Sequence, residues 1–282
     1  MQAFVKHIKE QLSSLYPKDE IRVFIRLLLD KVCGIPPYRQ LYDKDIKLSD
    51  TQAGCLNSCI ERLLNEEPIQ YILGETEFFG YTLNVAPGVL IPRPETEEMA
   101  ALIVKAHENR KPKILDIGTG SGCIALSLAK KINGAEVYAI DVSDEALAVA
   151  RKNAARIDVD VKFLLHDVFA LLPKAPLLPD FFDVIVSNPP YIMERERGAM
   201  LRNVLDYEPA GALFVPDHDP LLFYRQIAEV AFGRLAPEGV VYVEINALLG
   251  QETVALFKEK GFSDVQIVCD ISQKERFIAA RR

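Results

Sequence analysis

No apolar run in this 282-residue sequence approaches the roughly 18–20 residues that a membrane-spanning helix needs, so no membrane association is expected. The first residues, MQAFVKHIKEQL, have neither the apolar core nor the small-residue cleavage site of a secretory signal. Five cysteines are an odd number for a disulfide framework in a chain of this size. We therefore expect a protein of the reducing cytoplasm.

The sequence also lacks an excess of positive charge, since 33 Lys and Arg stand against 40 Asp and Glu, a formal net charge of −7. The excess acid lies after residue 70, because residues 1–70 hold ten basic and ten acidic side chains. A protein that binds along a phosphate backbone needs a basic face, so direct nucleic acid binding is not expected. With 49% apolar and 26% charged residues, the chain is typical of a globular protein with a substantial core.

Three helical patterns precede residue 70. Apolar residues recur at helical spacing in residues 4–15, 21–32 and 53–64. Ser49 and Gln52 have the spacing of a capping box at the start of the third helix. We predict a small helical bundle over residues 1–74 that recognises a substrate protein, with packing on the main domain as the alternative.

The pattern changes after residue 74. Residues 75–92 contain a short alternating stretch around Gly80, which predicts a β-hairpin linker. From residue 93 to 282 strand and helix patterns alternate, which predicts an α/β domain with a mostly parallel sheet. Five residues, 270–274, separate the last two strands, too few for a parallel crossover, so the sheet should end with an antiparallel strand. The seven expected strands are 113–117, 136–140, 161–165, 182–187, 239–245, 263–268 and 275–280.

A glycine-rich loop follows the first expected strand and precedes a helix. Residues 114–122 read ILDIGTGSG, and glycines at these positions let the backbone turn tightly against a ligand. Cys123 stands where a dinucleotide fingerprint has a third small residue, which weakens an NAD interpretation. A glycine-rich turn without a ligand is the alternative. The cofactor-binding residues predicted here are Asp116, Gly118, Thr119, Gly120, Ser121 and Gly122.

Acidic residues follow the next two strands. Asp141 comes about 20 residues after the glycines, where a carboxylate accepts from both ribose hydroxyls. After the third strand, Asp167 is placed to accept from an adenine amino group and Phe169 to cover the ring, although Asp167 in the alternative merely caps a turn. A ligand with a ribose, an adenine and a cationic or zwitterionic tail fits S-adenosylmethionine.

The fourth strand is followed by Asn188-Pro189-Pro190-Tyr191. The amide oxygen of Asn188 and the carbonyl oxygen of Pro189 can accept both hydrogens of a planar NH₂ group. This orientation points the π-lobe of a poor nitrogen nucleophile at a methyl group, and positioning of this kind supplies roughly 7–11 kcal/mol without a strong base. Tyr191 would stack on the planar group. We predict Asn188, Pro189 and Tyr191 as catalytic, with an ordinary Asn-Pro-Pro turn as the alternative.

These residues resemble the HemK/PrmC family, the peptide-chain release factor N5-glutamine methyltransferases. The likeness covers nearly the whole chain, and residues 92–97, Pro-Arg-Pro-Glu-Thr-Glu, are its most specific segment. Other matching segments are 68–74 (PIQYILG), 78–80 (FFG), 116–122, 188–191, 207–209 (YEP) and 224–225 (YR).

The resemblance implies a class I, Rossmann-like methyltransferase with a seven-stranded sheet and an N-terminal helical domain. It implies methyl transfer from S-adenosylmethionine, with S-adenosylhomocysteine as product, to the glutamine side-chain nitrogen in the Gly-Gly-Gln motif of class I release factors. Asn188 would contact both cofactor and substrate, and residues 189–191 would hold the glutamine. Arg93 would guide an anionic or backbone group of the partner, with an ordinary surface arginine between prolines as the alternative. Phe169 replaces a frequent tryptophan, Asn246 replaces a more usual glycine, and the expected glycine before Arg276 is missing.

Two other functions stay open from the residues alone. An N6-adenine methyltransferase acting on DNA or RNA would use the same tetrapeptide, but residues 71–282 carry 23 basic and 30 acidic side chains and leave no room for a recognition domain. The second is a catalytically silent module that binds cofactor or partner. No metal is expected, since Cys55 and Cys59 lack a second ligand pair. We expect a monomer.

Overall fold

The computed structural model describes residues 2–43, 46–170 and 177–282. The chain forms two compact units. The first runs to Glu75 and also includes Leu201–Tyr207, whereas the second comprises Thr76–Met200 and Glu208–Arg282. Within the described residues, no helix is both long and apolar enough to span a bilayer.

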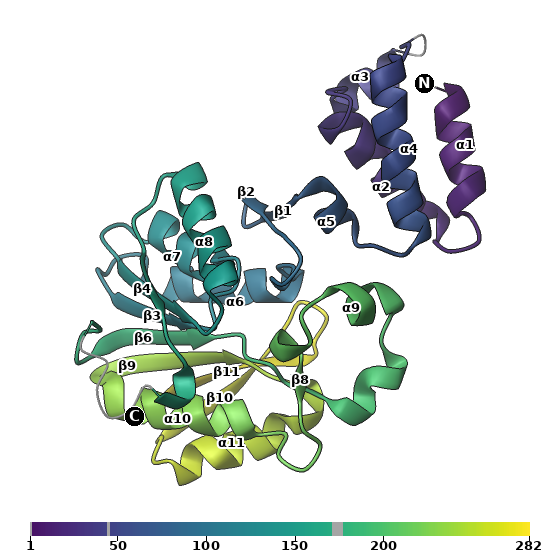
Figure 1. Cartoon of the computed structure of the whole chain (residues 1–282). Coiled ribbons are helices and arrows are strands. Elements are labelled where there is room, and N and C mark those ends of the chain that lie inside the picture. Colours follow the sequence, from purple (N-terminus) through teal and green to yellow (C-terminus); the bar gives the residue numbers. More distant parts are fainter. Residues whose placement is uncertain (1, 44–45, 171–176) are drawn as a thin grey trace. The chain divides into compact units, whose positions relative to one another are not determined.

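The first unit is a bundle of helices, as expected from the three apolar repeats (Figure 1). Its core consists of fully buried side chains such as Ile8, Leu28 and Leu56. The capping box is present, because the backbone N–H of Gln52 donates to Ser49 Oγ at 3.2 Å and the Ser49 N–H donates to Gln52 Oε1 at 2.9 Å. The helices are α1 (Gln2–Leu12), α2 (Lys18–Lys31), α3 (Pro37–Tyr42), α4 (Asp50–Leu64) and α5 (Ile69–Leu73).

The short helix α9 (Arg202–Tyr207) belongs to this unit although it lies more than a hundred residues away in the sequence. Tyr207 Oη donates to the Asn65 carbonyl at 2.7 Å, and the Arg202 guanidinium pairs with Glu66 at 3.0 Å. No sequence pattern predicted this grouping, because α9 has no buried face that periodicity would reveal.

A hairpin of β1 (Glu75–Phe78) and β2 (Tyr81–Asn84) occupies the predicted linker. Its two-residue turn places Phe79 at φ 51° and Gly80 at φ 79°, the left-handed pair of a type I′ turn. The Phe79 N–H donates to Glu97 at 2.7 Å, and Asn84 is held by the buried Asn153 through three hydrogen bonds of 2.6–3.0 Å. Glu97 and Asn153 thereby fix the hairpin to the rest of the second unit, which begins at Thr76.

The second unit contains the predicted seven-stranded sheet, in the order β10-β11-β9-β6-β3-β4-β5. All neighbours are parallel except those of β11, which runs antiparallel to both β9 and β10, so the predicted antiparallel last strand is confirmed. The strands are β3 (Lys113–Ile117), β4 (Glu136–Asp141), β5 (Lys162–Leu165), β6 (Phe182–Ser187), β9 (Leu235–Glu244), β10 (Asp264–Cys269) and β11 (Glu275–Arg281).

Helices cover both faces of the sheet (Figure 1). Alternate residues of β3 face different cores: Ile114 packs with α6 and α7, whereas Leu115 and Ile117 pack with α10 and α11. Burial on both faces explains the nearly continuous apolar strands. The helices are α6 (Pro94–His107), α7 (Cys123–Lys131), α8 (Asp144–Ile157), α10 (Leu222–Arg234) and α11 (Gly250–Glu259); β7 (Ile192–Met193) and β8 (Phe214–Val215) form a separate small pair.

Candidate active site

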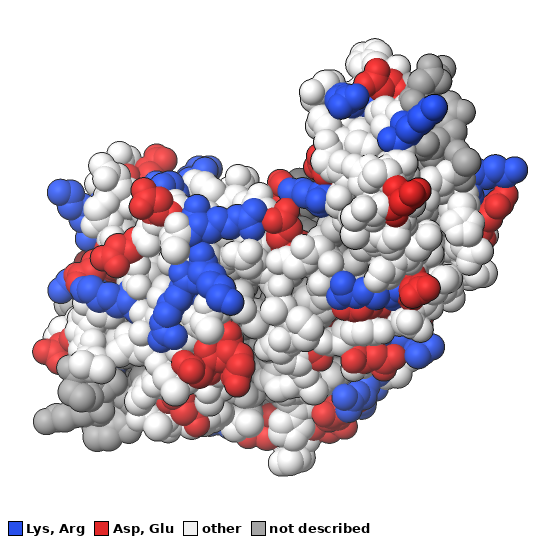
Figure 2. All heavy atoms as spheres, turned by 45° about the horizontal axis from the view of Figure 1, so that its top comes forward, with Lys and Arg blue, Asp and Glu red and all other residues white. Residues whose placement is uncertain are grey.

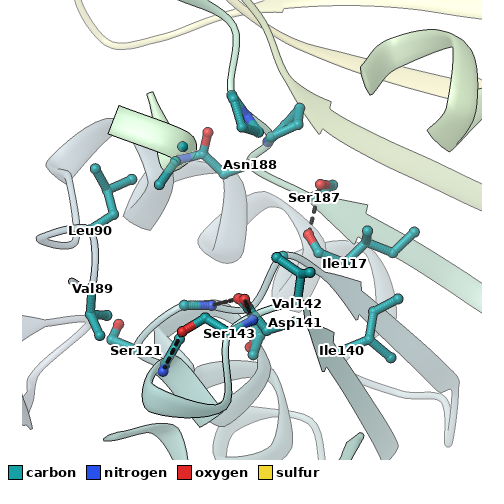
Figure 3. Close-up of a pocket in the computed structure, with 18 of the residues that line it drawn as sticks. Val89, Leu90, Ile117, Ser121, Ile140, Asp141, Val142, Ser143, Ser187 and Asn188 are labelled. Carbon is teal, nitrogen blue, oxygen red and sulfur yellow. Dashed lines mark hydrogen bonds between the residues drawn. The ribbon is translucent and has the colours of Figure 1, made fainter. Parts of the chain in front are cut away.

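A cavity of about 330 Å³ lies at the carboxyl ends of β3, β4 and β6. In the sheet, β4 lies on one side of β3 and β6 lies on the other, so the direction of the strand order changes at β3. Open α/β sheets bind ligands at such a switch point. Figure 3 shows Asn188 across this cavity from Asp141 and Ser143, with Val89 and Leu90 closing one side. The volume is within the usual range for small-molecule sites.

The three glycines of the loop after β3 have different environments. Gly118 and Gly120 line the cavity at φ 72° and 56°, and a Cβ built on either would enter open space. A Cβ on Gly122, at φ 82°, would lie 3.0 Å from Leu126 Cδ1 and 3.2 Å from Ala150 Cβ. The first two glycines therefore leave room for a ligand, and the third lets the helices pack.

Asp116 lies beneath the glycine loop and does not line the cavity. Its Oδ2 accepts from Thr119 Oγ1 at 2.7 Å and from the Ala125 N–H at 3.2 Å, whereas Oδ1 is buried without a partner. Burial raises the pKa of Asp116 to about 7. These hydrogen bonds hold the glycine loop in its conformation, so the role of this carboxyl in the structure is to support the loop. The predicted contact of Asp116 with a cationic cofactor stays a prediction.

Polar groups at the end of β4 suit a hydroxyl-bearing ligand. Asp141 Oδ2 accepts from the Gly120 N–H at 2.8 Å, and Oδ1 accepts from the Ser143 N–H at 2.9 Å, so the carboxylate is fixed in the cavity wall (Figure 3). Ser121 and Thr119 also line the cavity, and Ser121 Oγ is buried without a hydrogen-bond partner. An unpartnered buried hydroxyl is costly unless a ligand satisfies it. These groups fit the ribose and polar tail of S-adenosylmethionine.

The residues predicted for the adenine end are placed differently from one another. Asp167 lines the cavity, and its Oδ1 also accepts from the Phe169 N–H at 2.9 Å, so it caps the 3₁₀ turn η1 (Val168–Ala170). Phe169 is 43% exposed and lies outside the lining, because this turn carries its ring onto Phe223 with the ring centroids 5.3 Å apart. Phe223 itself lines the cavity. The aromatic surface nearest a ligand is therefore a residue that the sequence did not indicate.

The tetrapeptide after β6 forms the opposite wall. Asn188, Pro189 and Pro190 line the cavity, whereas Tyr191 is not among the lining residues, so its stacking on a substrate stays a prediction. Asn188 Nδ2 donates to Thr96 Oγ1 at 3.1 Å, and Tyr191 Oη donates to Glu244 Oε1 at 3.1 Å. Burial raises the pKa of Tyr191, with the neighbouring Glu244 carboxylate adding to the effect. The structure thus brings three of the four predicted residues to the cavity and holds the fourth by a buried acid.

Asn246 secures the same loop from another direction. Its Nδ2 donates to the Tyr191 carbonyl at 3.2 Å and to Glu196 Oε2 at 2.8 Å, and its Oδ1 accepts from the Leu248 N–H at 2.9 Å. A glycine at this position would make none of these bonds. The departure noted at position 246 therefore changes how the loop is held.

Arg93 lines the cavity but is already paired. Its Nη2 donates to Glu208 Oε1 at 2.5 Å, and Glu208 Oε2 accepts from the Ile91 N–H at 3.1 Å. The Glu208 side chain is 1% exposed and that of Arg93 is 32% exposed. Arg93 thus ties two segments of the cavity wall together, and its predicted contact with a substrate stays a prediction.

The sheet order, the antiparallel β11 and the glycine loop at the switch point define a Rossmann-like methyltransferase. Residues 81–207 match the Methyltransferase small domain and residues 4–74 match the PrmC N-terminal domain. Two release factor glutamine methyltransferases are similar over all or nearly all of their length. The one from Bacteroides thetaiotaomicron is 45% identical over 282 residues, 100% of each chain, and the one from Flavobacterium psychrophilum is 44% identical over 273 residues, 95% of this chain and 94% of that one. The chain belongs to the release factor glutamine methyltransferase family.

Solved structures agree on the fold. A methyltransferase from Pyrococcus furiosus has a TM-score of 0.54 at 22% identity, covering 72% of this chain and 89% of that one. The 16S rRNA N2 G1207 methyltransferase from T. thermophilus, solved with AdoMet and guanosine, has a TM-score of 0.53 at 24% identity, covering 74% of this chain and 50% of that one. Their likeness to this chain is one of fold.

Proposed function

We propose that this protein transfers a methyl group from S-adenosylmethionine to the side-chain amide nitrogen of the glutamine in the Gly-Gly-Gln motif of class I release factors. The observation that carries the proposal is the orientation of Asn188. Its NH₂ end is bonded to Thr96, which leaves Oδ1 as the end available to a substrate. Pro189, the next residue, also lines the cavity and carries a second oxygen acceptor, its backbone carbonyl.

Two oxygen acceptors side by side suit a planar NH₂ group. Pro189 and Pro190 have no N–H, so these two positions offer a substrate backbone carbonyl acceptors and no backbone donors. When both hydrogens of the glutamine amide are held in plane, the nitrogen π-lobe is perpendicular to that plane. Pro189 and Pro190, which line the cavity, keep water away from the nitrogen. Positioning therefore replaces a strong base, and the proton leaves only after the new N–C bond has formed.

Gly118, Gly120, Ser121 and Asp141 would hold the cofactor, with Asp167 and Phe223 at its adenine end. When bound, S-adenosylmethionine supplies an electrophilic methyl group on a sulfonium sulfur and is left as S-adenosylhomocysteine. The fixed carboxylate of Asp141 provides acceptors for ribose hydroxyls, and the open space beside the glycines admits a ligand close to the backbone.

The net negative charge of the methyltransferase domain is more compatible with a protein substrate than with a nucleic acid. Acidic side chains outnumber basic ones in residues 71–282, and Figure 2 shows the two signs intermixed over the visible face. Backbone binding to DNA or RNA depends on a basic surface. We infer that the helical unit recognises the release factor and that the enzyme acts as a monomer without direct contact to nucleic acid.

The test incubates the protein with methyl-labelled S-adenosylmethionine and either a class I release factor or duplex DNA. Label confined to the Gly-Gly-Gln peptide, and absent when that glutamine is replaced by alanine, supports the proposal. Label on DNA alone contradicts it and favours the adenine alternative. Cofactor binding without labelling of either substrate favours the catalytically silent module.

A further inference from the structure

Glu244 is a buried acid that contacts two parts of the active site. It is the last residue of β9 and only 1% exposed. Its Oε2 accepts from Thr96 Oγ1 at 2.7 Å, and its Oε1 accepts from Tyr191 Oη at 3.1 Å. Each carboxylate oxygen is therefore bonded to a hydroxyl group from a different segment, one on α6 and one in the loop after β6.

The chain of hydrogen bonds from Glu244 has a fixed direction. A threonine hydroxyl has one hydrogen, and an ionised carboxylate can only accept. Because Thr96 gives its hydrogen to Glu244, it presents only lone pairs to Asn188. The Asn188 amide must then turn its NH₂ end to Thr96, at 3.1 Å, and leave its oxygen free.

We propose that Glu244 is a positioning residue that fixes, through Thr96, which end of the Asn188 amide faces the substrate. This inference rests on the proposed function, in which Asn188 must offer an oxygen to a substrate NH₂ group. If Glu244 no longer accepts, the Thr96 hydroxyl is free to donate to Asn188. The amide can then turn over and oppose the substrate NH₂ with its own, donor against donor.

The groups around Glu244 determine the pH range in which it is ionised and can act as an acceptor. Burial raises the pKa of Glu244, while Thr96, Tyr191 and Arg276 of β11 oppose that rise and Glu95 of α6 adds to it. The raised pKa predicts that turnover falls on acidification, when the acid gains a proton and becomes a donor. Cys123 on α7 and Tyr224 on α10 also face this carboxylate and stay neutral, since burial raises the pKa of each.

The decisive variants are Thr96→Val and Thr96→Ser. The valine keeps the shape but removes the hydroxyl, whereas the serine restores it. We expect Thr96→Val and Glu244→Met, which removes both acceptor oxygens at similar volume, to lower kcat by roughly tenfold to a hundredfold, the usual effect of a misplaced reacting group, with a cofactor Kd within about twofold of the wild type. Thr96→Ser should recover most of the turnover. Thr253→Val is the matched control, because Thr253 is another buried helical threonine whose hydroxyl donates, to the Leu249 carbonyl at 2.7 Å, away from the cavity.

A second readout does not depend on the substrate. The side-chain amide signal of Asn188 in a nitrogen-15 NMR spectrum, assigned by its loss in Asn188→Asp, should move in Thr96→Val and Glu244→Met and stay near its place in Thr96→Ser and Thr253→Val. Unchanged kcat and unchanged amide signals in the first two variants would overturn the positioning role even if the wild type labels release factor. Shifted signals in a protein that labels no release factor would leave the positioning role standing and overturn the proposed function.

Discussion

Arg93 and Glu208, 115 residues apart in the sequence, form an ion pair of 2.5 Å in the wall of the active-site cavity. Glu208 is nearly inaccessible and also accepts from the Ile91 backbone. The pair joins two distant points of the chain, one just before α6 and the other just after α9. Residues noticed in the sequence as separate motifs, Pro-Arg-Pro and Tyr-Glu-Pro, are therefore two halves of one structural element.

Removing Arg93 should destabilise the second unit. Arg93→Ala leaves the Glu208 carboxylate buried without its cation, and breaking buried pairs costs about 3–5 kcal/mol, which partial exposure of Arg93 reduces to about 1–3 kcal/mol. Urea unfolding measures the change. Arg151→Ala, which breaks an exposed pair with Asp144, should cost less than about 1 kcal/mol. Equal losses in the two variants would show that the Arg93 pair has no special structural role.

Asn188→Ala should separate cofactor binding from turnover. The alanine removes the oxygen that receives the substrate amide, and loss of one such positioned hydrogen-bonding group typically lowers kcat by about 10²–10³-fold. Single-turnover methyl transfer measures the chemical step, and calorimetry measures cofactor affinity. We expect affinity to change little. Near-normal methyl transfer by this variant would contradict the role assigned to Asn188.

Asp116 should make stability depend on pH. The pKa of its carboxyl is about 7 when folded and 3.8 in its ordinary state, so between these values the folded protein holds a proton that the unfolded chain has lost. The free energy of unfolding contributed by this group therefore falls as pH rises from about 4 to 7. In Asp116→Asn an NH₂ group replaces the unpartnered Oδ1 and cannot titrate. The free energy of unfolding of the variant, minus that of the wild type, should therefore increase as the pH rises. Urea unfolding at several pH values measures it, and a difference that is constant from pH 4 to 8 would contradict the raised pKa.

Gly120→Ala should reduce cofactor affinity more than stability. The new methyl group would enter the cavity, and the left-handed φ of 56° adds roughly 1 kcal/mol of backbone strain. Gly80→Ala, at φ 79° in the hairpin turn with open space around its Cβ, carries similar strain at a position that does not line the cavity. Comparing the cofactor Kd and the urea midpoint of the two variants isolates the steric effect. Equal affinities would show that no ligand approaches Gly120.

Gln273→Gly should stabilise the protein. The turn between β10 and β11 places Gln273 at φ 62°, where the glycine expected before Arg276 is missing. Glycine adopts this conformation without strain, so we expect a gain of about 0.5–1 kcal/mol. Gln266→Gly, on an exposed position inside β10, should instead cost about that amount, since glycine weakens a strand. Thermal unfolding of both variants provides the measurement.

The seven strands, the helices between them and the capping box at Ser49 were predictable because each depends on residues close together in the sequence. The glycine loop and residues 188–191 were predictable for the same reason: each is contiguous and directly follows a buried strand. The roles of Phe169 and Arg93 were less predictable. A single turn of η1 moved the first out of the cavity wall, and Glu208, far away in the chain, engaged the second.

By itself the sequence determined the sheet, its antiparallel end and the site at the carboxyl edge, since alternation, helical periodicity and short connections leave few arrangements of the chain. Only the tertiary structure decided what holds the reacting group. Thr96, Asn188 and Glu244 come from three distant segments and have no shared local pattern. Burial is the physical reason that they meet: an acid removed from water at the end of β9 needs hydrogen-bond donors, and the hydroxyls of Thr96 and Tyr191 supply them.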